Sequence, residues 1–109
     1  MFLTDLSIRL DTVEWADDVP GIRAREASVE GRRWAIVEYE RGARRLEWCR
    51  DGHVGLVLTG AVEYEFEDGG GLTVRRGDAF QLATGRAHRG TNRADGTTRL
   101  FLIDDAVAE

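Results

Sequence analysis

From about residue 31 onward, short apolar or alternating runs separated by glycines indicate successive β-strands, and no long amphipathic helix is expected. The clearest alternation covers residues 62–67, where Val62, Tyr64 and Phe66 point one way and three glutamates point the other. The glycine-rich stretch 68–71 follows as a hairpin turn, because residues without Cβ adopt positive φ at little cost. This part of the chain therefore predicts a half-buried strand that turns back into a partner.

The remaining strands are expected over residues 33–40, 44–49, 54–58, 72–75, 79–82 and 98–104. Around eight or nine short strands favour a closed barrel or jelly roll over an open sheet, because closure removes unpaired strand edges. Residues 17–21, which contain Pro20, predict an N-terminal loop that leads into an edge strand. The predicted fold class is all-β, a single jelly-roll β-barrel.

The length and composition indicate one folded domain. At 109 residues, with 42% hydrophobic and 32% charged side chains, the chain has enough apolar residues for one core. We expect residues 1–30 to form an N-terminal arm and edge strand, residues 31–104 the barrel, and residues 105–109 a tail that frays or adds a short turn.

Charge and cysteine content restrict the expected partners and compartment. With 15 basic and 20 acidic residues the net charge is -5, so neither a nucleic acid nor an anionic membrane is an expected partner. Cys49 is the only cysteine, which excludes an internal disulfide. Residues 1–6 lack the basic and apolar regions of a signal peptide, and no run is long enough to span a membrane. A cytoplasmic location is the simplest expectation.

Five residues in the second half of the chain stand at a distinctive spacing. Gly77, Gly85, His88 and Asn92 keep every interval of the pattern G-x5-P-x-G-x2-H-x3-N, with Ala83 at the proline position. This pattern is the second signature motif of the cupin superfamily, which the chain therefore resembles. The resemblance implies a single cupin-type jelly-roll barrel, a fold that serves enzymes, binding modules and storage proteins alike.

The first cupin motif, G-x5-H-x-H-x3,4-E-x6-G, is kept as a frame with other residues in it. Counting back from Gly60 places His53 at the glutamate position and Glu47 and Cys49 at the two histidine positions, and Gly42 stands one residue closer than the opening glycine. The resemblance covers residues 42–92 at the level of these motifs. It implies a metal site with four candidate ligands: Glu47, Cys49, His53 and His88.

The residue types support such a site independently of the resemblance. Both histidines of the chain and its only cysteine fall within this frame. Glu47 and Cys49 are two apart on an expected strand, so they would share a face with Cα atoms about 6.5 to 7 Å apart. One carboxylate, one thiolate and two imidazoles suit a divalent transition metal, Zn²⁺, Fe²⁺, Ni²⁺ or Co²⁺, better than Mg²⁺ or Ca²⁺.

Two alternatives remain open for this set of residues. Without Cys49, the residues Glu47, His53 and His88 form the two-histidine, one-carboxylate set of non-haem iron oxygenases. Without a metal, Cys49 is a small buried hydrophobe, His53 a turn residue and His88 a hydrogen-bonded core histidine.

The sequence leaves the function itself open between two classes. One is a metal-dependent enzyme of oxygenase or isomerase type that acts on a small organic molecule, although no catalytic residue can be named. The other is a non-catalytic module that binds or senses a small ligand, with or without metal. The apolar residues Trp48, Val54, Leu56 and Leu58 are expected to point outward, and a homodimer that covers them is predicted.

Overall fold

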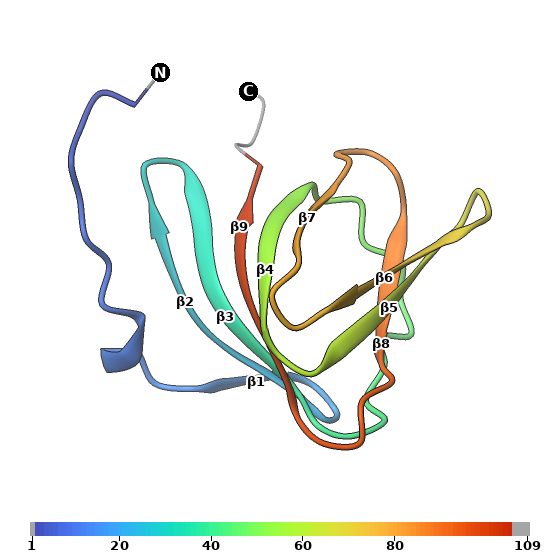
Figure 1. Ribbon diagram of the computed structural model, residues 1–109. Coiled ribbons are helices and arrows are strands. Elements are labelled where there is room, and N and C mark those ends of the chain that lie inside the picture. The colour runs from blue at the N-terminus through green and yellow to red at the C-terminus, as the bar shows by residue number, and fades with distance from the viewer. Residues whose placement is uncertain (1, 106–109) are drawn as a thin grey trace.

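Two antiparallel sheets make up most of the computed structural model, which describes residues 2–105 (Figure 1). The larger sheet has the strand order β1-β2-β3-β9-β4-β7, and the smaller has the order β6-β5-β8. In chain order the elements are the 3₁₀ helix η1 (Leu10–Thr12), β1 (Ala16–Val19), β2 (Ile22–Val29), β3 (Arg32–Tyr39), β4 (His53–Thr59), β5 (Ala61–Phe66), β6 (Gly71–Arg75), β7 (Ala79–Leu82), β8 (His88–Asn92) and β9 (Thr98–Asp104). This confirms the predicted all-β class.

Alternation of side chains puts the core between the two sheets. In β5, Val62 and Tyr64 are buried while Glu63 and Glu65 are exposed, as the sequence pattern predicted. The Tyr64 ring lies 5.6 Å from the ring of Phe80 on β7, so an aromatic contact joins the smaller sheet to the larger one. Apolar side chains fill the space between the sheets and leave one end of it for polar residues.

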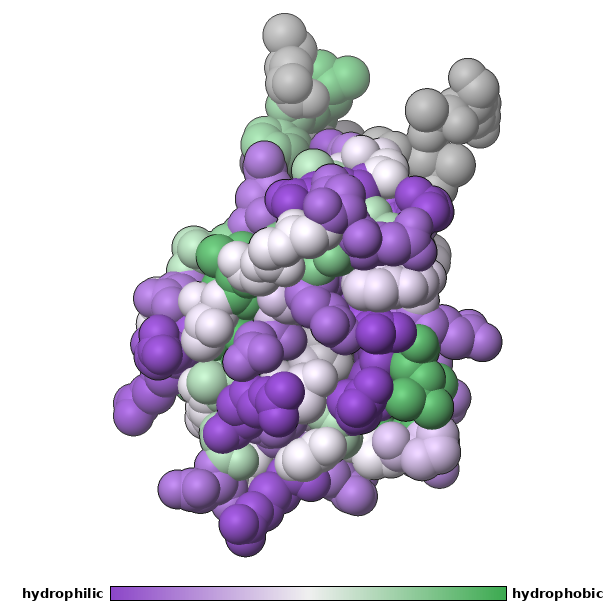
Figure 2. All heavy atoms as spheres, turned by 90° about the vertical axis from the view of Figure 1, so that its right-hand side faces the viewer, coloured by the Kyte–Doolittle hydropathy of each residue, from purple (hydrophilic) through white to green (hydrophobic). Residues whose placement is uncertain are grey.

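The polar side chains outside this core dominate the surface on the smaller-sheet side. Figure 2 shows this side as mainly hydrophilic, with only small separate apolar areas. No helix among residues 2–105 is long and apolar enough to cross a membrane.

Several strand predictions are confirmed nearly residue for residue. The run 98–104 matches β9 in full, 54–58 lies within β4, and 33–40 matches β3 to within one residue at each end. The hairpin at 68–71 is also confirmed, with Gly69 and Gly70 at φ +106° and +82°. These are the segments in which local alternation and turn chemistry agree.

The strand predicted over residues 44–49 is wrong. This segment is irregular and touches the smaller sheet through two isolated bridges, Arg44 to Thr91 and Cys49 to His88. Its side chains do not keep the alternation of a strand, since the neighbours Leu46 and Glu47 are both exposed and the next two residues are both half-buried. The geometric argument that placed Glu47 and Cys49 on one strand face therefore fails.

The N-terminal third contributes more to the barrel than the sequence indicated. The expected loop over 17–21 is mostly the edge strand β1, and only Pro20 and Gly21 turn the chain into β2. Ile22 and Ala24 of β2 are buried in the core, so the barrel extends N-terminal of residue 31. The predicted behaviour of the tail falls mainly on residues 106–109, which lie outside the described residues.

Asn92, the last residue of the second motif, is a structural hub. Its buried amide donates to the carbonyls of Tyr39, Glu40 and Gly96, and its Oδ1 accepts from the Thr98 hydroxyl and the Ala94 N–H. These contacts tie the ends of β3, β8 and β9 together. The asparagine at this motif position therefore has a structural role, which its hydrogen bonds to the strand ends account for.

We predict that Asn92→Ala lowers the free energy of unfolding by about 2–4 kcal/mol, because three carbonyls and two donors lose their buried partner. Urea unfolding followed by tryptophan fluorescence measures the loss. Thr91→Ala, the adjacent and less buried position, is the matched control. A difference between the two variants below about 1 kcal/mol would contradict the role of Asn92.

The outer face of the larger sheet carries the residues for which a dimer was predicted. Val54 and Leu56 of β4 are 54% and 39% exposed, and their β9 partners are Ile103 and Phe101. Leu58 is half-buried. Trp48 does not belong to this face, because its ring stacks under Arg89, 4.0 Å away.

The homodimer stays a prediction. Size-exclusion chromatography with light scattering is expected to give twice the 12.2 kDa chain mass. The double variant Val54→Glu/Leu56→Glu should elute as a monomer, because it places two carboxylates on the uncovered apolar face. A wild-type monomer would contradict the prediction.

Candidate metal centre

Three polar side chains meet at the end of the barrel where the segment 40–52 crosses from the larger sheet toward the smaller one. His53 is the first residue of β4 and His88 the first residue of β8, so each lies where a strand begins. Cys49 is held against β8 by two backbone hydrogen bonds of 2.8 Å, one in each direction between Cys49 and His88. This pairing brings a residue of an irregular segment beside two strand residues from different sheets.

The side chains of Cys49, His53 and His88 form a compact cluster. One candidate ligand atom from each lies within 4.8 Å of the other two. The Cys49 Sγ is 3.9 Å from Nε2 of His53, and the two imidazole rings are 5.1 Å apart in an edge-on arrangement. The structure thus brings together three of the four ligands predicted from the sequence.

Glu47, the fourth predicted ligand, is not part of this cluster. Its side chain is exposed, although the residue lines the same cavity as the cluster. The reason is the irregular course of residues 44–49, which does not hold Glu47 on the same face as Cys49. As a ligand, Glu47 stays a prediction.

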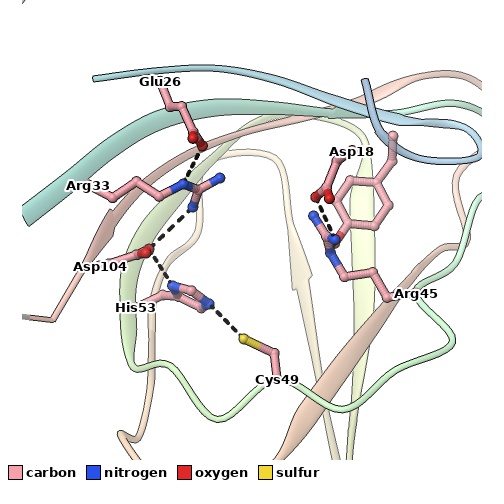
Figure 3. A network of polar contacts seen from close by, with 8 residues as sticks. Asp18, Glu26, Arg33, Arg45, Cys49, His53 and Asp104 are labelled. Carbon is pink, nitrogen blue, oxygen red and sulfur yellow. Dashed lines mark hydrogen bonds and ion pairs between the residues drawn. The ribbon is translucent and has the colours of Figure 1, made fainter. Parts of the chain in front are cut away.

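Asp104 is a site residue that the sequence analysis missed. It pairs with His53 across β9 and β4, and its Oδ1 lies 2.7 Å from Nδ1 of His53. Arg33 approaches the same carboxylate oxygen at 3.4 Å and also contacts Glu26, as Figure 3 shows. A carboxylate that accepts a hydrogen bond from Nδ1 fixes the orientation of the ring. Nε2 then faces Cys49 and is free to bind a metal ion between the two residues.

This network changes the proton affinities of the cluster. Hydrogen bonds from His53 and then His88 stabilise the thiolate and lower the pKa of Cys49 to about 6, although burial opposes this. Burial disfavours charge on His53, but the contacts with Asp104 and Cys49 outweigh it and raise its pKa to about 9. Burial would also raise the pKa of Asp104, yet His53 and Arg33 hold it below its usual value. Near neutral pH and without metal, these opposite shifts favour a thiolate on Cys49 beside an imidazolium on His53.

The donor set and the surroundings fit a transition metal ion. A thiolate and two imidazoles are ligands for zinc, iron, nickel or cobalt. Nδ1 of His88 is a buried nitrogen for which no described residue supplies a hydrogen-bond partner, although buried polar atoms normally have one. Asp104 already provides the carboxylate that commonly orients a metal-bound histidine.

The cluster opens into a cavity of about 900 Å³. Its walls combine apolar side chains such as Val37, Tyr64 and Leu102 with several arginines and carboxylates. A cavity of this size accommodates a small organic molecule next to the cluster.

Comparison with known proteins identifies the fold. No family model and no curated protein sequence matches the chain. Among solved structures, an RmlC-like cupin from Shewanella frigidimarina aligns over 97% of this chain and 95% of its own, with a TM-score of 0.75 and 16% identity. KdgF from Halomonas sp. aligns over 94% of both chains, with a TM-score of 0.70 and 24% identity. This chain has the cupin fold.

A longer protein aligns with this chain over part of its own length. Oxalate decarboxylase OxdC from Bacillus subtilis covers 100% of this chain and 32% of its own, with a TM-score of 0.76 and 18% identity. Identities this low establish the fold and carry no activity across.

We predict that alkylation of Cys49 by iodoacetamide in metal-free protein follows a titration with a midpoint near pH 6, where an ordinary cysteine would give a value near 9. Asp104→Asn should shift the midpoint upward, because loss of the carboxylate lowers the pKa of His53 and so removes positive charge beside the thiolate. Asp95→Asn, an exposed residue elsewhere, removes the same charge and should leave it unchanged. An unshifted midpoint in Asp104→Asn would contradict the coupling.

Proposed function

We propose that this cupin binds one divalent transition metal ion through Cys49, His53 and His88 and acts as a metal-dependent enzyme of oxygenase or isomerase type on a small organic molecule. The observation that carries the proposal is the orientation of His53, whose Nδ1 is held by Asp104 while its Nε2 faces the thiol of Cys49. Three protein ligands are the number that catalytic metal sites use, because one position is then left for a substrate.

A metal bound here would supply Lewis-acid or redox chemistry to a molecule in the cavity. The protein groups prepare the site in three ways. Asp104 holds the tautomer and the ring plane of His53, and the Tyr64 ring packs edge-on against His88 with centroids 5.8 Å apart. Val37 and Leu102, both buried, add an apolar wall to the cavity into which the cluster opens.

The solved structures support the proposal only in a general way. The cupin fold of oxalate decarboxylase belongs to an enzyme, so a barrel of this shape is compatible with chemistry on a small organic molecule. Zinc, iron, nickel and cobalt all remain consistent with the ligand set. The exposed Glu47 side chain lines the same cavity, and an inward turn of it would add a fourth ligand.

A non-catalytic binding or sensing role is the second candidate. It is favoured by the engagement of Asp104, because this carboxylate is bound to His53 and Arg33 and has no freedom to act as a general base. The same metal centre would then hold a ligand without converting it.

We predict that protein purified without an affinity tag, and then supplied with Zn²⁺ or Co²⁺, holds one metal ion per chain by elemental analysis. His88→Ala should lose this stoichiometric metal, because it removes one of three ligands. Glu47→Gln should retain it if the three-residue cluster is the binding site, with circular dichroism confirming the fold of each variant.

Two outcomes would contradict this prediction. One is wild-type protein that takes up neither metal, and the other is a folded His88→Ala variant that keeps a full equivalent. Loss of metal in Glu47→Gln would restore the four-ligand site predicted from the sequence.

A further inference from the structure

A second polar group lies in the cavity, apart from the three-residue cluster. The Arg45 side chain is 25% exposed, and its guanidinium lies 2.7 Å from Oδ2 of Asp18. Its Nε donates to the hydroxyl of Tyr39 at 3.3 Å. Figure 3 shows Arg45 and Asp18 across the cavity from His53 and Cys49. A guanidinium has five N–H donors, more than the single contacts with Asp18 and Tyr39 use, which leaves donors for a ligand.

Backbone hydrogen bonds attach Arg45 and Cys49 to neighbouring positions on β8. The N–H of Arg45 donates to the carbonyl of Gly90 at 3.0 Å, as the N–H of Cys49 does to the carbonyl of His88. Gly90 and His88 are two residues apart on β8, so the two attachment points are separated by about 7 Å of strand. Arg45 and the metal centre are thus anchored to one short stretch of β8 and line the same cavity, so one small molecule there can contact both.

The charge of the cavity favours one class of ligand. Its lining contains four arginines and an equal number of carboxylates: Arg33, Arg44, Arg45, Arg50, Asp18, Glu47, Asp51 and Asp104. Among the lining residues alone these charges balance, so a divalent ion bound to the thiolate of Cys49 adds one net positive charge to the lining. A ligand with a single negative charge neutralises the loaded cavity, whereas a dianion overcompensates it.

We propose that the ligand of this site is a small organic monoanion, a carboxylate with a second oxygen donor such as a 2-hydroxy acid, whose carboxylate binds Arg45 while the other oxygen faces the metal centre. This inference rests on the proposed function, because it requires the metal. Guanidinium and carboxylate are complementary in charge and in hydrogen-bond geometry. Asp18 orients the guanidinium, and its negative charge would oppose the bound carboxylate.

Substitution of Asp18 is expected to change anion affinity in the direction opposite to substitution of Arg45. Its carboxylate forms an ion pair with the Arg45 guanidinium and partly neutralises its charge, so Asp18 competes with a bound anion. Asp18→Asn keeps the shape and removes the charge. If Arg45 anchors an anion, this variant binds it more tightly, whereas Arg45→Met binds it more weakly.

The experiment uses Co²⁺-loaded protein and glycolate as the probe, measured by isothermal titration calorimetry. Arg45→Met is expected to weaken glycolate binding at least tenfold, and Asp18→Asn to strengthen it severalfold. Arg41→Met, an exposed arginine outside the cavity lining, removes the same charge and should bind as the wild type does. Ethylene glycol, which lacks the carboxylate, and inorganic phosphate should bind more weakly than glycolate to the wild type.

The outcomes separate this inference from the proposed function. Failure to bind Co²⁺ in any form overturns the proposed function and the inference with it. Normal Co²⁺ binding overturns the inference alone if glycolate does not bind, if ethylene glycol or phosphate binds as well as glycolate, or if Asp18→Asn weakens glycolate binding. Equal glycolate affinity in wild type and Arg45→Met also overturns it, and Co²⁺ affinity in each variant serves as the check on folding.

Discussion

The two backbone hydrogen bonds between Cys49 and His88 are the contact on which the candidate site depends. They attach an irregular segment to the first residue of β8 and thereby bring a thiol from outside both sheets to two strand histidines. Arg89 reinforces the attachment, because it stacks on Trp48 and donates to the carbonyl of Leu46. The ligand geometry therefore comes from backbone pairing and not from the side chains alone.

The electrostatics of the site follow from this placement. A thiolate in a partly buried position needs a positive neighbour, and His53 provides it because Asp104 in turn stabilises the charged ring. Arg33 extends the chain of contacts to Glu26 on the outside of the barrel. A metal ion would replace the proton on His53 as the positive partner of the thiolate, so the same carboxylate serves both states.

Much of the fold was predictable from the sequence because it depends on local pattern. The alternation in β5 and the glycine hairpin after it set strand and turn without reference to the rest of the chain. Gly60 also follows from local conformation, since its φ of +80° is one that glycine adopts at little cost. The segment 44–49 could not be predicted in this way, because its course depends on Asp18 and Arg89, which lie far away in the sequence.

The candidate site was predictable only in part for the same reason. The motif frame located Cys49, His53 and His88, whose meeting the structure supports. In the sequence, Asp104 is recognisable only as an acidic residue at the end of an apolar strand. Its pairing with His53 could not be predicted, because it depends on β9 lying beside β4. X-ray absorption spectroscopy of Zn²⁺-loaded protein reports whether one sulfur and two nitrogen ligands of this chain bind a single ion. We expect one sulfur at about 2.3 Å and two imidazole nitrogens at about 2.0 Å, and a coordination shell without sulfur would exclude Cys49 as a ligand.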